Sequence, residues 1–103
     1  MHIRSRPVSN GVVSLVVAGE IDMVTADELS RAMRTAILAD DSVEVVLDFA
    51  DVTFCDSSGL AALDAAYAEG ARRGTVLRLV NVQPPVRRLL EIMDMADTLT
   101  EPR

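Results

Sequence analysis

The sequence predicts a single α/β domain over residues 1–103, with a mixed sheet of four to five strands and about three helices. Half of its residues are apolar but only 3% are aromatic, so the core must be built from Val, Leu, Ile, Met and Ala. β-Branched residues suit buried strands, and Ala-rich helices pack closely on them. Segments with strand composition alternate with segments of helical periodicity, which favours parallel strands joined by right-handed crossovers. The expected order is β-β-α-β-α-β-α, with or without a last strand.

The first two strands are expected to form an antiparallel hairpin. The segment as far as Val8 has the composition of a strand, and Val12–Val17 is a second apolar run. Asn10-Gly11 lies between them, and this dipeptide is typical of a tight hairpin turn.

The first helix follows Gly19-Glu20-Ile21-Asp22. Thr25 and, three residues later, Glu28 match a capping box and predict where this helix begins. Its apolar residues then recur at helical spacing on one face: Leu29, Met33 and Ile37.

The next strand is expected at 43–49, because this run is apolar except for Glu44 and Asp48. Such a run is typical of a central strand covered on both faces. Residues 50–56 are expected to form a polar connection. A second helix is expected from Ser57 to about Arg73, with Gly74 placed to end it.

The last third of the chain predicts one more strand and one more helix. The strand is expected at 75–80, and Pro84-Pro85 suits the first turn of a helix. The buried side of that helix is expected to carry Val86, Leu89, Leu90 and Met93. Beyond Met95 two interpretations remain open, a short strand through Thr98–Thr100 or a frayed end.

Charge and composition exclude several classes of function. The net charge of −6 disfavours binding to nucleic acid or to an anionic membrane surface, and favours a basic protein surface as partner. Cys55 is the only cysteine, which excludes an internal disulfide and a metal site with several cysteines. The N-terminal segment lacks the apolar core of a signal peptide, and no stretch is long and apolar enough to span a membrane. We therefore expect a cytoplasmic protein.

Asp56-Ser57-Ser58-Gly59 is the most informative stretch, because it presents two hydroxyls at the expected start of a helix. One interpretation is structural, since Asp or Ser at this position caps a helix and stabilises it by about 1 kcal/mol. The other rests on anion chemistry. The first turn of a helix has unpaired N–H groups and a partial positive charge, so a phosphate on a serine there would be tolerated. This reasoning leaves open which serine would accept it.

Three collinear stretches resemble a known family. The run at 45–60, Val-Val-Leu-Asp-Phe-Ala-Asp-Val-Thr-Phe-Cys-Asp-Ser-Ser-Gly-Leu, looks like the signature of the STAS domain family in its anti-sigma-factor-antagonist branch. Gly-Glu-Ile-Asp at 19–22 and Val-Arg-Arg-Leu-Leu at 86–90 resemble that family's other two motifs. The match covers nearly the whole chain, but Met95-Ala96 stands where the family often has Gly-Leu.

The resemblance implies a mechanism. In this family the unphosphorylated antagonist binds an anti-sigma factor that is also a serine kinase, and a sigma factor is thereby freed. The kinase then phosphorylates the first serine of the motif, here Ser57, which ends the binding, and a PP2C-type phosphatase restores it. Asp56, Ser58 and Gly59 would form the surrounding loop, and Asp22 would lie close to it and help to dock the kinase. The alternative is a STAS scaffolding subunit of a transporter or signalling assembly that is never phosphorylated.

The sequence gives little support for catalysis, a cofactor or a metal. A P-loop and a Gly-x-Gly-x-x-Gly motif are missing, and no Gly-x-Ser-x-Gly elbow surrounds Ser57. His2 is the only histidine, so a Ser-His-Asp triad would have to recruit the start of the chain. Asp48 invites comparison with receiver domains, but the acidic pair that those domains carry near the N-terminus is missing. Cys55 is expected to be a buried thiol at a strand end.

Overall fold

The computed structural model describes residues 1–6 and 8–100 and has the α/β fold that the sequence predicts. The elements are β1 (His2–Ser5), β2 (Val12–Ile21), α1 (Ala26–Ile37), β3 (Glu44–Cys55), α2 (Ser57–Arg72), β4 (Val76–Val80), α3 (Pro84–Ile92) and α4 (Ala96–Thr100). The expected order is therefore confirmed as far as α3.

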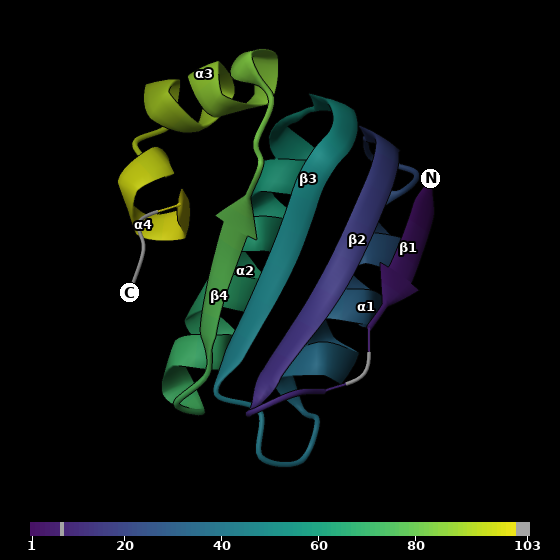
Figure 1. Ribbon diagram of the computed structural model, residues 1–103. Coiled ribbons are helices and arrows are strands. Elements are labelled where there is room, and N and C mark those ends of the chain that lie inside the picture. The colour runs from purple at the N-terminus through teal and green to yellow at the C-terminus, as the bar shows by residue number, and fades with distance from the viewer. Residues whose placement is uncertain (7, 101–103) are drawn as a thin grey trace.

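The sheet has four strands in the order β1-β2-β3-β4 (Figure 1). β1 is antiparallel to β2, whereas β2, β3 and β4 are mutually parallel, so the sheet is mixed as predicted. The hairpin turn at Asn10-Gly11 is confirmed, since both residues have positive φ, 55° and 79°, as a type I′ turn requires.

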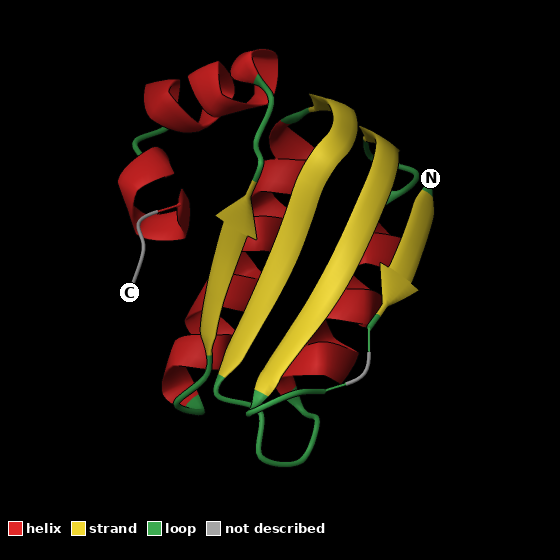
Figure 2. Cartoon of the chain, in the orientation of Figure 1, coloured by secondary structure: helices red, strands yellow, loops and turns green. Residues whose placement is uncertain are grey.

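Helices α1 and α2 cover one face of the sheet, α4 lies beside β4, and α3 lies beyond the carboxyl end of β4, where it contacts β3 (Figure 2). The expectation that β3 is covered on both faces is wrong. Val45 and Leu47 are fully buried, but Val46 and Asp48 on the opposite face are only half-buried. The strand order explains the difference. Because both right-handed crossovers step in the same direction along the sheet, their helices fall on the same side.

β3 is longer than expected, and the predicted polar connection at 50–56 is wrong for all but its last residue. Beyond Asp48, which pairs with Val80, the strand loses β4 as a neighbour but stays paired with β2 as far as Cys55. Val52 and Cys55 are buried in this extension. β2 and β3 therefore extend past the end of β4, and the loops that follow these two strands lie beyond the rest of the sheet.

The C-terminal segment differs from both of its open interpretations. It forms the short helix α4, in which Ala96 and Leu99, three residues apart, are both buried. α3 begins at Pro84 as predicted, but Met93 lies just beyond it with 53% of its surface exposed, so its expected burial is wrong. Within residues 1–6 and 8–100, no helix is long and apolar enough to cross a bilayer.

Candidate functional site

Two loops meet at the carboxyl ends of β2 and β3. Ile21 and Cys55, at the ends of these strands, are paired in the sheet. The next N–H along, that of Asp56, donates to the carbonyl oxygen of Ile21 at 3.1 Å. The loop that begins at Asp22 and the turn at Asp56 that leads into Ser57 of α2 are thus neighbours.

Asp56 caps helix α2. Its Oδ1 accepts hydrogen bonds from the N–H groups of Ser58 at 2.9 Å and Gly59 at 3.3 Å. The capping interpretation is therefore correct for Asp56. The expectation that unpaired N–H groups await a phosphate needs correction, since the Asp56 carboxylate already engages two of them and the N–H of Leu60 donates to the Asp56 carbonyl.

The two serines lie in different surroundings. Ser57, the first residue of α2, is exposed, whereas Ser58 is half-buried. The structure thus separates two hydroxyls that physical reasoning on the sequence left equivalent. Ser57 is the more accessible of the two.

Gly59 is buried where α2 crosses the ends of β2 and β3. A Cβ at this position would lie 2.5 Å from the Sγ of Cys55 and 2.6 Å from the Cγ2 of Ile21. These distances are too short for non-bonded atoms, so only glycine allows the helix to start this close to the sheet. Gly59 therefore sets the position of Ser57 rather than offering a contact of its own.

Asp22 organises the turn before α1. Its Oδ1 accepts from the N–H of Thr25 at 3.0 Å, and the Oγ1 of Thr25 accepts from the N–H of Asp22 at 2.9 Å. This reciprocal pair is a capping box that lies three residues upstream of the predicted one. The prediction of a box at Thr25 and Glu28 is wrong, since the Thr25 side chain makes no cap bond to the helix. The hydrogen bond from the Thr25 N–H is the main cause that lowers the pKa of Asp22.

Exposed apolar side chains flank the two loops, and the sequence reasoning missed them. Met23 and Val24 are 76% and 85% exposed, and Phe54 is 49% exposed. A groove beside Phe54 is lined by Ser57 and by Val86 and Leu89 of α3. One signal was available: Met23 and Val24 stand in a polar turn, outside any helical or strand period.

Cys55 and the two serine hydroxyls are the remaining reactive groups of this region. Burial raises the pKa of the Cys55 thiol to about 11, and the neighbouring Asp56 adds to the shift, so the prediction of a buried thiol is confirmed. Among residues 1–6 and 8–100, neither serine hydroxyl of the motif is hydrogen-bonded to a base, and no group of three His, Cys, Asp or Glu side chains is placed to hold a metal ion.

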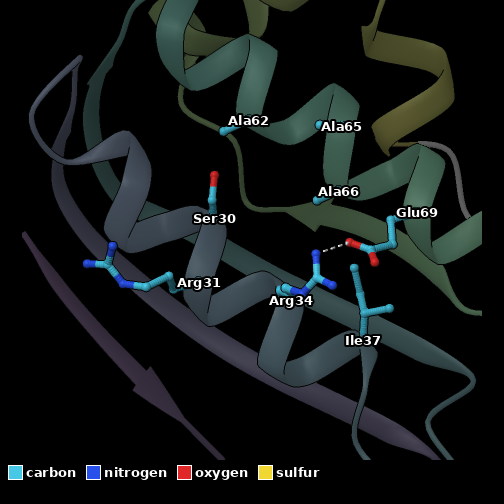
Figure 3. Close-up of a pocket in the computed structure, with 8 residues that line it drawn as sticks. All are labelled: Ser30, Arg31, Arg34, Ile37, Ala62, Ala65, Ala66 and Glu69. Atoms are coloured by element: carbon cyan, nitrogen blue, oxygen red, sulfur yellow. Dashed lines mark hydrogen bonds and ion pairs between the residues drawn. The ribbon is translucent and has the colours of Figure 1, made fainter.

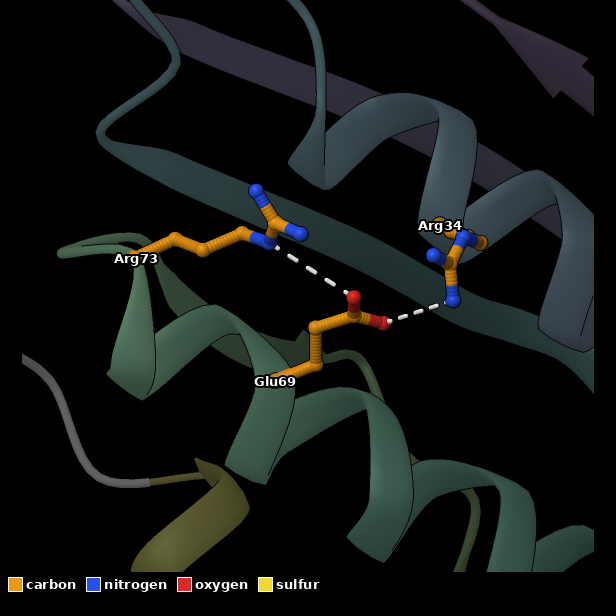
Figure 4. Close-up of polar contacts among 3 residues, drawn as sticks. All are labelled: Arg34, Glu69 and Arg73. Carbon is orange, nitrogen blue, oxygen red and sulfur yellow. Dashed lines mark hydrogen bonds and ion pairs between the residues drawn. The ribbon is translucent and has the colours of Figure 1, made fainter.

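A second hollow lies between α1 and α2, away from the two loops (Figure 3). Its floor consists of small or aliphatic side chains, such as Ala62, Ala66 and Ile37. Glu69 bridges the helices across it, at 3.4 Å from Arg34 and 3.5 Å from Arg73 (Figure 4). Arg34 and Glu69, which line this hollow, form the ion pair that joins the two helices, and we assign the hollow a structural role.

Residues 5–102 match the STAS domain. The chain belongs to the STAS domain family. It is 33% identical over 82 residues to the anti-sigma F factor antagonist of Paenibacillus polymyxa, a match that covers 80% of this chain and 70% of that protein. An anti-sigma factor antagonist from Mycobacterium paratuberculosis has a similar crystal structure, with 33% identity, a TM-score of 0.78, and coverage of 95% of this chain and 83% of that one.

SpoIIAA, an anti-sigma factor antagonist, shares the fold of this STAS domain. Its unphosphorylated form superposes with a TM-score of 0.82 at 20% identity, covering 99% of this chain and 89% of that one. Its phosphorylated form gives a TM-score of 0.74 at 19% identity, over 99% and 92% of the two chains. The expected fold class is therefore confirmed.

Proposed function

We propose that this STAS domain is an anti-sigma factor antagonist that is switched by phosphorylation of Ser57. In its unphosphorylated form it binds an anti-sigma factor that is also a serine kinase, and the sigma factor is freed. Phosphorylation of Ser57 by that kinase ends the binding, and a PP2C-type phosphatase reverses it. The observation that carries this proposal is the exposed Ser57 at the start of α2, in a chain whose relative is named an anti-sigma F factor antagonist.

The geometry around Ser57 supports a switch that acts on binding rather than on folding. A phosphate adds about −1.5 to −2 charges. It would be attached to an exposed hydroxyl, while the Asp56 carboxylate already accepts from two N–H groups of the adjacent helix end. The added charge would therefore project toward the partner and would lie beside another negative group.

The apolar side chains beside Ser57 supply a contact surface for the partner. Met23, Val24 and Phe54 are well exposed on both sides of the two loops. Well-packed apolar side chains at the centre of an interface carry most of the binding energy, and a charge forced into such a centre costs several kcal/mol. Since each 1.4 kcal/mol is a factor of ten, one phosphate would weaken the complex by about a hundredfold or more.

The proposal makes the domain a binding module of the cytoplasm, not an enzyme. Asp22 and Asp56 add negative charge to the contact surface and favour a basic patch on the kinase. In the first turn of α2, we assign Ser58 to the surface that the kinase recognises and Gly59 to the packing that holds this turn in place. The alternative is a scaffolding subunit with the same fold, in which Ser57 is never phosphorylated.

The test combines phosphosite mapping with binding. The endogenous protein is digested and its phosphopeptides are mapped by mass spectrometry across growth and stress conditions. Affinity-tagged variants then capture partners from the host, and the captured anti-sigma kinase is quantified. We expect phosphate on Ser57 with variable occupancy, tight capture by Ser57→Ala, and loss of capture by Ser57→Asp.

The matched control is Ser58→Asp, which adds the same charge to the half-buried neighbour. A general effect of acidity would weaken both aspartate variants equally. Equal capture of the kinase by Ser57→Ala and Ser57→Asp would overturn the proposal. Full peptide coverage with no phosphate in any condition would favour the scaffolding alternative.

A further inference from the structure

The outer edge of β1 is an unpaired strand edge in the part of the chain that the structure describes. β1 forms the margin of the sheet, and β2 is its only strand neighbour among residues 1–6 and 8–100 (Figure 1). An edge strand presents a row of backbone donors and acceptors that another extended chain can pair with. The register shows which groups these are.

Ile3 and Ser5 point their backbone groups away from β2. The N–H of Arg6 donates to the carbonyl oxygen of Ser14 at 2.9 Å, in the same register that pairs Arg4 with Val16. In an antiparallel pair, bonded and non-bonded positions alternate. Arg4 and Arg6 therefore bond to β2, whereas the N–H and C=O groups of Ile3 and Ser5 face outward.

An apolar groove runs alongside this edge, between β1 and α1. Its volume is about 410 Å³, and it is lined by the side chains of Ile3 and Ser5, by Leu15 of β2, and by Ala32 and Ala36 of α1. A strand paired with β1 places the side chains opposite Ile3 and Ser5 on this same face. Its alternate residues would thus lie at the groove and should be apolar.

The other face of the edge is positively charged. Arg4 and Arg6 are exposed, and within residues 1–6 and 8–100 neither guanidinium forms an ion pair. The first acidic residue of the chain is Glu20. Two copies of β1 paired edge to edge would bring like charges together, which disfavours self-association. The same charges favour a strand with acidic residues opposite Arg4.

We propose that β1 is a docking edge for an extended protein segment in which acidic and apolar residues alternate. The apolar residues lie at the groove, and the acidic residues lie beside Arg4 and Arg6. A register shifted by one residue would place the acidic side chains at the groove instead. That register is disfavoured, because the acidic side chains would face Glu28 at the rim of the groove. This edge lies midway along β2, apart from Ser57, so docking here does not depend on the phosphorylation state.

The probe is a synthetic hexapeptide of alternating glutamate and valine with blocked ends, and its control replaces each glutamate with lysine. Binding to the full chain is followed by NMR titration and by amide hydrogen exchange. We expect the glutamate peptide to slow exchange at the Ile3 and Ser5 amides severalfold and to leave the Arg4 amide, which already bonds to β2, unchanged. The lysine peptide should slow neither.

Two variants at one exposed position separate pairing from nonspecific adhesion. Ser5→Pro removes an outward donor without removing a bond to β2, as proline allows on an edge strand. It should weaken binding about tenfold, whereas Ser5→Ala, which keeps the N–H, should bind like the wild type. Thermal unfolding of both variants checks that the fold is intact. Arg4→Glu should reverse the preference toward the lysine peptide.

Three outcomes would overturn the proposal: no protection of Ile3 and Ser5 by the peptide, equal binding by Ser5→Pro and Ser5→Ala, or an Arg4→Glu variant with unchanged preference. Protection that grows with protein concentration in the absence of peptide would instead assign the edge to a second copy of this chain. Unchanged peptide binding by Ser57→Asp would show that this edge acts apart from the serine switch, and a loss there would contradict that independence.

Discussion

The backbone N–H of Asp56 donates to the carbonyl oxygen of Ile21 at 3.1 Å, so the turn before α2 is bonded to the end of β2. The bond joins residues 35 positions apart in the sequence. It continues the pairing of Ile21 with Cys55 by one residue. Asp22 and Ser57 consequently belong to one surface whose shape depends on the packing beneath it.

Gly59→Ala should disturb that surface and destabilise the fold. The added methyl group would lie 2.6 Å from the Cγ2 of Ile21, so α2 must move outward. Overpacking of this kind costs about 1–3 kcal/mol, measurable by urea unfolding. Binding of the proposed anti-sigma kinase should fall at the same time, because Ser57 moves with the helix.

Gly74→Ala is the matched control for this prediction. Gly74 has φ +76° and open space around it, so alanine there is strained by its backbone alone, at about 1–2 kcal/mol. It should destabilise the protein to a similar degree and leave kinase binding unchanged. A loss of binding in both variants would mean that global stability, not the position of α2, governs the interaction.

The charge of Asp22 should stabilise the protein at neutral pH and cease to do so in acid. Hydrogen bonds led by the Thr25 N–H hold its pKa below the ordinary value of 3.8. The folded state therefore favours the charged form, and the contribution is present above 3.8 and lost as the pH falls through the lower folded value. Asp22→Asn should lower the free energy of unfolding at pH 7, and the difference from wild type should vanish toward pH 2. Urea unfolding across this range checks it, and a constant difference at all pH values would refute the role of the charge.

Cys55 should be an unreactive thiol that weakens the fold only at high pH. Its pKa of about 11, against an ordinary value of 9.0, lowers the thiolate fraction at pH 8 about a hundredfold. Reaction with a disulfide reagent should be slow in the folded protein and fast in urea. Because the raised pKa favours the neutral form, its stabilising contribution is complete below pH 9 and lost as the pH rises toward 11. Cys55→Ala should lack this alkaline component, and equal alkaline loss in both proteins would contradict the assignment.

The ion pairs of Glu69 should add little stability. Arg34 and Arg73 are 62% and 49% exposed, so water and salt screen their attraction to Glu69 (Figure 4). Glu69→Gln should cost less than about 1 kcal/mol, and 1 M salt should remove most of that cost.

Glu44→Gln is the comparison. The carboxylate of Glu44 accepts a hydrogen bond from the Nε of Arg78 at 2.9 Å, and only 13% and 26% of these two side chains are exposed. The substitution should cost about 1–2 kcal/mol and respond less to salt. Denaturant unfolding at two salt concentrations measures both variants. If Glu69→Gln lowered the free energy of unfolding more than Glu44→Gln does, the bridge between α1 and α2 would matter more than its exposure suggests.

Local sequence signals were sufficient for most elements of the fold. Asn10-Gly11 determined the hairpin, because few other dipeptides tolerate two positive φ values in succession. Pro84-Pro85 marked the start of α3, and Asp56 marked the cap of α2. The family motif determined the choice of Ser57, since both serines of the motif have the same chemistry.

Tertiary structure alone decided what depends on partners distant in the sequence. The extension of β3 to Cys55 rests on pairing with β2, and the helix at Ala96 rests on burial of Leu99. The sequence predicted the capping box of α1 at Thr25 and Glu28, whereas the folded chain forms it between Asp22 and Thr25. Which face of the sheet stays uncovered follows from the strand order, and the exposure of Ser57 follows from the close approach of Gly59 to Ile21. The sequence by itself determined the chemistry of the site, whereas the packing of the chain decided which of those groups meet the solvent, because burial is set by neighbours that local patterns do not encode.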